Sequence, residues 1–377
     1  MKPYAFRFGG EEGNKMKKKI LLISLLILVL PLCVFAESEE EGGVYRLLDE
    51  NGETVTWYAG SPETGDEYIA GDNRHYRLIQ IDEKAKLARM ESLGSFTLPD
   101  VSWLDEETQP VSAAKKSVAL YCTHSDESYE PGDGKSSIEK RGGIYDVAES
   151  LKAALERKGI TVHYSDENHY PHDAGAYRRS RATAASLAEE GVDAIFDVHR
   201  DGIPDAAQYE SRVKGEDVTK VRLLVGRQNQ NADANKQFAA QIKAVADKLY
   251  PGLVKDIYMG KGSYNQDLMS QAVLLEFGTH KSDKNEVLAS TAYMADVLNR
   301  ALYGGVSGAA GKDTKPAAEN SGGWTGISWL AVIGLGGLFL YAFAASGSLK
   351  TAGHKMKRSF QEMTGGLLGG RSGRHDE

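Results

Sequence analysis

The amino-acid sequence predicts an α/β fold: a mostly parallel sheet with helices on both faces, a small N-terminal β-rich module, and a C-terminal transmembrane helix. Three observations lead to this prediction. Between residues 117 and 303, short apolar runs closed by turn formers alternate with segments of helical spacing, which is the pattern of β-α-β units. Short segments of β type fill residues 43–105, and an uncharged apolar stretch occupies residues 327–346.

The composition supports a globular core and excludes one class of partner. Hydrophobic residues make up 41% of the 377 residues, which is enough for one domain of ordinary size plus appendages. A net charge of -8 argues against nucleic acid as a partner. Cys33 lies in an apolar N-terminal segment, so Cys122 alone offers no disulfide framework; its place in an apolar strand predicts a buried structural thiol.

Residues 1–36 are predicted to be a secretory signal region, with Met16 as an alternative start. Lys17, Lys18 and Lys19 form a basic segment, a long apolar run follows, and Ala36 closes a small-x-small cleavage site. An uncleaved membrane anchor is the alternative interpretation.

The pattern over residues 43–105 predicts a series of short strands. Its first two apolar runs, 44–48 and 54–58, flank Asn51-Gly52, a dipeptide typical of hairpin turns. Further runs of the same type follow as far as Met90. We expect a small β-rich module that serves as a spacer or as a docking surface for another protein.

The domain over residues 117–303 alternates strands and helices. Strands are expected at 118–123, 160–164, 194–199, 221–226 and 271–276, and helices at 138–158, 177–190, 235–249 and 284–303. Alternation of this length predicts parallel strands covered on both faces.

The C-terminal part is predicted to anchor the protein. Residues 304–326 are rich in Gly, Ala and Ser and form a flexible linker, and 327–346 have the length of a membrane span. The tail over 347–377 is basic, so the positive-inside rule places it in the cytoplasm and the domain of 117–303 outside. The prediction is therefore a single-pass protein of the cell membrane.

Three of the predicted strands end at residues that can bind a metal ion or accept a proton. His124 and His199 follow two strands, and Glu276 closes a third. Parallel strands bring their carboxyl ends to one edge of the sheet, where α/β proteins hold their sites. Zinc hydrolases need imidazole or carboxylate ligands and a carboxylate that accepts a proton from water. Two histidines would be ligands and Glu276 the proton acceptor, with Glu139 as the remaining ligand because it stands near the start of the next predicted helix.

Other assignments stay open at this point. Glu139 could instead be a helix-capping acid. His163, His169 and His172 are alternative ligands, and His280 could contact substrate. Nucleophilic catalysis is disfavoured because the sequence contains no Gly-x-Ser-x-Gly motif and Cys122 is better explained as a core residue. The sequence contains no Gly-rich phosphate-binding loop either.

Several ordered motifs carry a resemblance to a known family. They are THSDES at 123–128, YRRSR at 177–181, FDVHRD at 196–201, VGRQNQN at 225–231, YPGL at 250–253, YNQDL at 264–268 and AVLLEFG at 272–278. Together they resemble the stage II sporulation protein P family, and the last also resembles the wider group of zinc-dependent N-acetylmuramoyl-L-alanine amidases. The likeness covers roughly residues 117–303.

The resemblance implies an enzyme that cleaves the amide bond between N-acetylmuramic acid and the L-alanine of the peptidoglycan stem peptide. It implies zinc as cofactor, His124 and His199 as ligands, Glu139 in the place of the amidases' second ligand, and Glu276 as the catalytic carboxylate. Arg200 would hold a stem-peptide carboxylate, or form an ion pair.

The resemblance also implies a setting and partners. These are engulfment during sporulation, the transglycosylase stage II sporulation protein D, and the membrane protein stage II sporulation protein M. Two alternatives remain: a catalytically silent scaffold that binds peptidoglycan at the septum, and a zinc peptidase.

Overall fold

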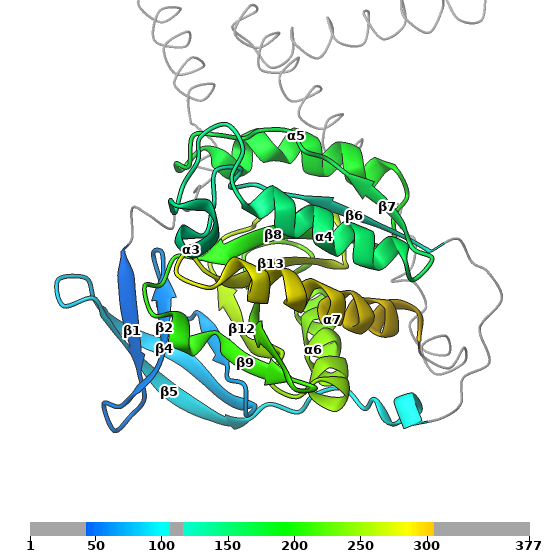
Figure 1. Cartoon of the computed structure of the whole chain (residues 1–377). Helices are drawn as coiled ribbons and strands as arrows, with labels where there is room; N and C mark the ends of the chain where they lie inside the picture. The colour runs from blue at the N-terminus through cyan, green and yellow to red at the C-terminus, as the bar shows by residue number, and fades with distance from the viewer. Residues whose placement is uncertain (1–42, 106–115, 305–377) are drawn as a thin grey trace, which may run out of the picture. The chain divides into compact units, whose positions relative to one another are not determined.

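The computed structural model describes residues 43–105 and 116–304, which fall within one compact unit (Figure 1). The strands are β1 (Val44–Leu48), β2 (Thr54–Ala59), β3 (Glu67–Ile69), β4 (Arg74–Asp82), β5 (Leu87–Ser95), β6 (Ser117–Tyr121), β7 (Thr161–Tyr164), β8 (Ala194–Asp201), β9 (Glu210–Val213), β10 (Glu216–Thr219), β11 (Val221–Gly226), β12 (Val254–Gly260) and β13 (Ala272–Thr279). The α-helices are α3 (Glu130–Asp133), α4 (Ile144–Glu156), α5 (Ala176–Glu189), α6 (Ala232–Leu249) and α7 (Lys284–Tyr303).

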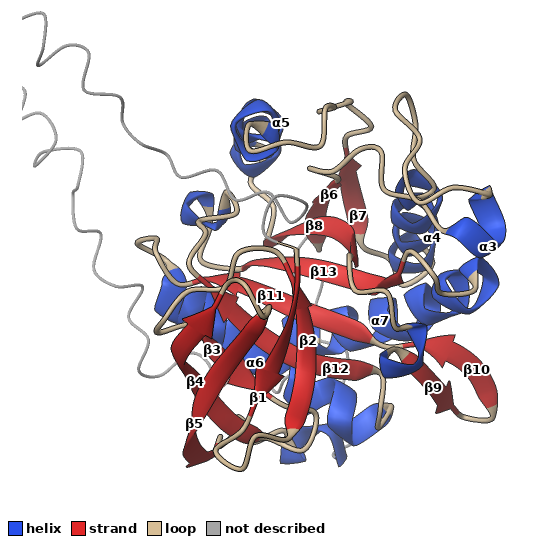
Figure 2. Ribbon diagram, turned by 90° about the vertical axis from the view of Figure 1, so that its left-hand side faces the viewer, coloured by secondary structure: helices blue, strands red, loops and turns tan. Residues whose placement is uncertain are grey.

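One sheet of eleven strands runs through this unit in the order β2-β1-β5-β4-β3-β12-β11-β13-β8-β6-β7 (Figure 2). In its second half, from β12 to β7, every neighbouring pair is parallel except β11 and β13. The predicted mostly parallel sheet is confirmed there.

Helices cover both faces of that half, as predicted. Val118, Leu120 and Val198 point to one face and pack with α4, α6 and α7. Ala119 and Tyr121, the intervening residues of β6, point to the other face and pack with α5. Every residue of β6 and β8 is buried, as expected for strands covered on both sides.

The β-rich stretch contains the predicted strands, but it does not stand apart from the rest of the fold. β1 and β2 pair antiparallel around the predicted hairpin turn at Asn51-Gly52. β3 then pairs with β12, so the same sheet continues into the second half. Leu47 and Leu78 share a core with Leu224 and Leu274. These strands therefore cover β11 and β13 on the same face as α5, in the part that α5 does not reach.

Several elements differ from the sequence prediction. Helix α4 begins at Ile144, not at 138, because the chain before it folds back on itself: the Gly142 N–H donates to the Ser125 carbonyl. A Cβ at Gly142 would lie 2.2 Å from the Glu127 carbonyl oxygen, so this close approach requires glycine. The hairpin β9–β10 was not predicted. Strand β12 was also not predicted, because Lys255 and Asp256 interrupt its apolar pattern.

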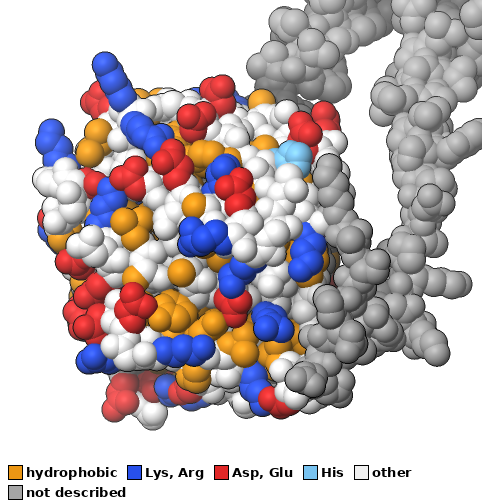
Figure 3. All heavy atoms as spheres, turned by 45° about the vertical axis from the view of Figure 1, so that its right-hand side comes forward, with side chains coloured by type: hydrophobic (Ala, Val, Ile, Leu, Met, Phe, Trp, Pro, Cys, Tyr) orange, Lys and Arg blue, Asp and Glu red, His pale blue; other side chains and the backbone are white. Residues whose placement is uncertain are grey.

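Cys122 is fully buried, as predicted for a structural thiol. On the face seen in Figure 3, basic and acidic side chains are interspersed. No helix within residues 43–105 and 116–304 is long and apolar enough to cross a membrane. The predicted signal region, the transmembrane segment 327–346, the basic tail and nearly all of the linker 304–326 lie outside the described residues.

Glu67 joins the β-rich strands to α6 and makes stability depend on pH. His75 lies 3.0 Å from its carboxylate and Lys236 lies 2.8 Å from it. The hydrogen bond with His75 outweighs burial and, with Lys236, lowers the pKa of Glu67 from 4.5 to about 2. Because the folded pKa is depressed, this stabilisation is present above pH 4.5 and is lost as the pH falls towards 2.

Glu67→Gln is therefore expected to lower the free energy of unfolding at pH 7 by about 1 kcal/mol, a value discounted for the screening of a half-buried pair. The difference from wild type should shrink at pH 3. Urea denaturation at both pH values measures it. Glu91→Gln on β5, whose exposed carboxylate lies 3.7 Å from Arg77, is the control and should change little. An equal loss at both pH values would contradict the electrostatic explanation.

Candidate metal centre

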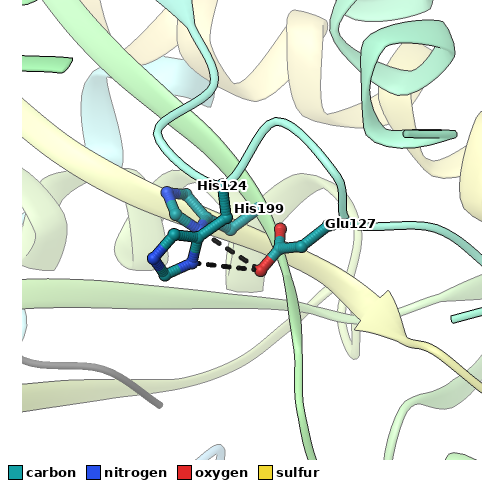
Figure 4. A group of neighbouring side chains, drawn as sticks. All are labelled: His124, Glu127 and His199. Atoms are coloured by element: carbon teal, nitrogen blue, oxygen red, sulfur yellow. Dashed lines mark ion pairs between the residues drawn. The ribbon is translucent and has the colours of Figure 1, made fainter. Parts of the chain in front are cut away.

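His124, Glu127 and His199 form a fully buried group at the edge of the sheet (Figure 4). His124 and Glu127 come from the loop after β6, and His199 comes from β8. The Glu127 Oε1 atom lies 3.3 Å from His124 Nδ1 and 3.6 Å from His199 Nδ1. One ligand atom from each residue lies within 4.8 Å of the other two.

Neighbouring groups hold Glu127 and His199 in place. The second oxygen of Glu127 accepts a hydrogen bond from the Arg200 backbone N–H at 3.0 Å. His199 Nε2 lies 2.9 Å from Asp197 Oδ1, and Asp197 accepts hydrogen bonds from the Thr123 N–H and hydroxyl. A carboxylate behind a histidine is the usual support for a metal-binding imidazole, because it fixes the ring and its tautomer.

The unpaired atoms of this group fit a metal ion. His124 Nδ1, His199 Nδ1 and Glu127 Oε1 are buried and have no hydrogen-bond partner among the described residues. Leaving three such atoms unpaired is unfavourable unless something binds them. Two imidazole nitrogens and one carboxylate oxygen match the ligand set of a catalytic zinc ion, which keeps a further position open.

The electrostatics favour the ligand forms of Glu127 and His124. Burial alone would raise the pKa of Glu127, but the nearby histidines lower it well below its usual range, so the side chain is a carboxylate. Burial, with His172 second, lowers the pKa of His124 to about 4, which leaves a neutral imidazole.

Glu276 lies beside this group but is not part of it. On β13 it is the direct register partner of His199 on β8. Burial, and then the negative charge of Asp201, raises the pKa of Glu276 to about 8, against the opposing effect of Arg222. A carboxyl group whose pKa lies near neutrality is suited to taking up and returning a proton.

Comparison with known proteins identifies the family. The family model described as Stage II sporulation protein P (SpoIIP) matches residues 63–299. The chain belongs to the stage II sporulation protein P family. The resemblance drawn from the motifs is thus confirmed, and the matched region also includes β3, β4 and β5 of the β-rich stretch.

One curated member of the stage II sporulation protein P family is similar at the sequence level. It is Stage II sporulation protein P of Bacillus subtilis (strain 168), 28% identical over 247 residues. The match covers 60% of this chain and 60% of the relative, which is less than two thirds of that protein's length.

Solved structures of N-acetylmuramoyl-L-alanine amidases resemble about half of this chain. The enzyme from Clostridium difficile 630 is 13% identical, with 50% of this chain and 95% of that chain covered and a TM-score of 0.34. AmiC2 of Nostoc punctiforme is 14% identical, with coverages of 51% and 97% and a TM-score of 0.32.

Two of the other motifs that carry the resemblance lie next to this group. Tyr177 of YRRSR places its ring 5.4 Å from that of His124 and 6.3 Å from that of His199. Tyr264 of YNQDL lies 5.3 Å from the Tyr177 ring. Segments far apart in the sequence therefore line one site.

Glu139 is not brought into the group, in contrast to the sequence prediction. It is exposed in the loop before α4, where its carbonyl oxygen accepts a hydrogen bond from Asn168. The prediction placed Glu139 at the start of a helix, and that placement is wrong because α4 begins only at Ile144. Glu127, three residues after His124 in the motif THSDES, stands beside the histidines instead; the short His-x-x-Glu spacing was the available signal.

Arg200 is buried, and its guanidinium donates to the backbone carbonyls of Asp201 and Ser136. Its contact with the centre is the backbone hydrogen bond to Glu127. Binding of a stem-peptide carboxylate by Arg200 stays a prediction.

Among the three alternative ligands, which all lie in the described residues, only His172 packs against the group of His124, Glu127 and His199. Its ring stacks on that of His124 with centroids 3.7 Å apart, and its Nδ1 lies 3.4 Å from Asp126 Oδ1. His169 uses both ring nitrogens elsewhere, with the Cys122 carbonyl and the Thr183 hydroxyl. His163 lies near Glu190, and the backbone carbonyl of His280 accepts from Glu130.

Proposed function

We propose that this protein is a zinc-dependent N-acetylmuramoyl-L-alanine amidase that releases stem peptides from peptidoglycan. The observation that carries the proposal is the buried group of His124, Glu127 and His199, whose facing atoms have no partner, beside a carboxyl group with a raised pKa. Membership of a sporulation family supports remodelling of the cell wall during sporulation as the setting.

Each residue has a defined role in this proposal. His124, Glu127 and His199 would hold the zinc ion, whose chemistry there would be to acidify water and to polarise the scissile carbonyl. Glu276 accepts the proton of the attacking water and returns it to the leaving amine of L-alanine. Tyr209 and Arg222 approach Glu276 at Oε2, so we assign the proton to Oε1. Buried Asp197 keeps His199 oriented throughout.

The location and partners belong to the same proposal. The apolar stretch 327–346 and the basic tail support a single-pass protein of the cell membrane with its catalytic domain outside, where peptidoglycan is the substrate. Stage II sporulation proteins D and M are the proposed partners.

Digestion of purified peptidoglycan tests the activity. The full chain, purified in detergent, is incubated with cell wall with and without a zinc chelator, and mass spectrometry identifies the products. Free stem peptides that begin with L-alanine are expected, should disappear on chelation and should return with added zinc. Cuts within the stem peptide would indicate a zinc peptidase, and zinc binding without any release would indicate a scaffold.

A further inference from the structure

A row of charged side chains crosses four neighbouring strands next to the proposed centre. Asp256 on β12 is the register partner of Arg222 on β11, which is the partner of Glu276 on β13, which is the partner of His199 on β8. Register partners point to the same face of a sheet, here the face opposite α6 and α7 (Figure 2). All four side chains are buried.

Arg222 makes most of the contacts in this row. Its Nε and Nη2 atoms donate to the two oxygens of Asp256 at 2.7 and 3.0 Å, which is a bidentate pair. Its Nη1 atom donates to Asp201 Oδ2 at 2.9 Å and lies 3.8 Å from Glu276 Oε2. Tyr209 donates to Asp201 at 2.7 Å and approaches Glu276 Oε2 at 3.3 Å. Arg222 and Tyr209 therefore both face the same Oε2 atom of Glu276.

Strand β2 of the β-rich stretch completes the network. The Nη2 atom of Arg222 donates to the Trp57 carbonyl at 3.1 Å and approaches the Thr56 hydroxyl at 3.4 Å. Lys255 donates to the Thr56 hydroxyl at 2.9 Å and to Asp256 at 2.6 Å. Thr56 is itself buried. Two residues about 165 positions before Arg222 in the sequence therefore supply its remaining acceptors.

The same strand packs on the loop that follows His199. Ala59 forms a small apolar cluster with Ile203 and Tyr209. A Cβ at Gly202 would lie 2.9 Å from the Ala59 Cβ, so the two segments touch closely. Movement of β2 would disturb both Arg222 and the segment that carries Asp201 and Tyr209.

We propose that strand β2 of the β-rich stretch supports the catalytic centre: through Thr56 and Trp57, β2 orients Arg222, and Arg222 with Tyr209 orients the Glu276 side chain. Thr56, Arg222 and Tyr209 are positioning residues, because they act through Glu276. A fully buried guanidinium needs all of its partners, since an incompletely paired buried charge is strongly unfavourable. The inference rests on the proposed role of Glu276 and gives the β-rich strands a task other than spacing or docking.

Substitutions of Thr56 in the full chain test the inference. Thr56→Val removes the hydroxyl with little change of shape, Thr56→Ser restores a hydroxyl, and Thr54→Val on the exposed side of β2 is the matched control. We expect Thr56→Val to lower kcat for stem-peptide release by about 10- to 100-fold. KM and zinc content should not change. Thr56→Ser should recover most of the turnover, and Thr54→Val should match wild type.

Hydrogen exchange gives a readout that does not need activity. In Thr56→Val, the peptide that covers residues 272–279 should exchange faster than in wild type, whereas Thr54→Val should leave it unchanged. If wild type releases no stem peptides, the amidase proposal fails. The hydrogen-exchange comparison of Thr56→Val with Thr54→Val then decides by itself whether Thr56 affects the strand that carries Glu276. Wild-type kcat together with wild-type exchange in Thr56→Val would overturn the inference, as would equal losses in Thr56→Val and Thr54→Val.

Tyr209→Phe is the second variant in case Thr56→Val does not fold. It keeps the buried ring and removes the hydroxyl that contacts Asp201 and Glu276. The same fall in kcat at constant KM is expected, and an unchanged kcat would contradict the proposed orientation of Glu276.

Discussion

Glu276→Gln is expected to abolish stem-peptide release while the protein stays folded and retains zinc. The amide keeps the size of the side chain and its contact with Tyr209, but it cannot accept the proton of the attacking water. Loss of a general acid and base lowers turnover by roughly 10²- to 10⁴-fold. The measurement combines kcat on purified peptidoglycan fragments with the zinc content of the protein by elemental analysis. Glu276→Ala should give the same result.

The control for this substitution is Glu210→Gln, which changes an exposed glutamate of β9. It should retain wild-type turnover and zinc. Undiminished activity of Glu276→Gln would remove Glu276 from the mechanism. Loss of zinc from Glu276→Gln would instead make this residue a ligand.

Glu127→Gln is expected to lose zinc, whereas Glu139→Gln is expected to keep both zinc and activity. The Oε1 atom of Glu127 faces the Nδ1 atoms of His124 and His199, and its charge offsets that of the bound ion. Removing this charge should weaken zinc binding by on the order of 100-fold or more, since even residues behind a ligand contribute 10- to 100-fold. Competition with a chromogenic chelator measures the affinity of each variant.

The two glutamates are a matched pair, because both lie in the chain between β6 and α4 and differ in burial. Glu127 is fully buried in the group, and Glu139 is exposed. Zinc retained in Glu127→Gln and lost in Glu139→Gln would restore the ligand set predicted from the sequence. Loss in both would indicate that the whole loop, and not one carboxylate, determines the affinity.

Local residue patterns were enough to predict several features of the fold. Apolar runs closed by turn formers located β6, β8 and β13, and the residues at their ends placed His124, His199 and Glu276 at one edge of the sheet. The dipeptide Asn51-Gly52 located the first hairpin. Each of these signals lies within about ten residues, so burial and turn geometry leave a direct trace in the residue pattern.

The folded chain was needed to identify the carboxylate that lies beside the histidines and the contacts that the β-rich strands make. The choice between Glu127 and Glu139 depends on how the loop before α4 folds back, which local periodicity does not record. Strand β12 escaped prediction because Lys255 and Asp256 are polar yet buried, a burial made possible by partners on β11 and β2. Contacts between Thr56 and Arg222 join residues 166 positions apart. Such pairings depend on the arrangement of strands in space, so only the folded chain reveals them.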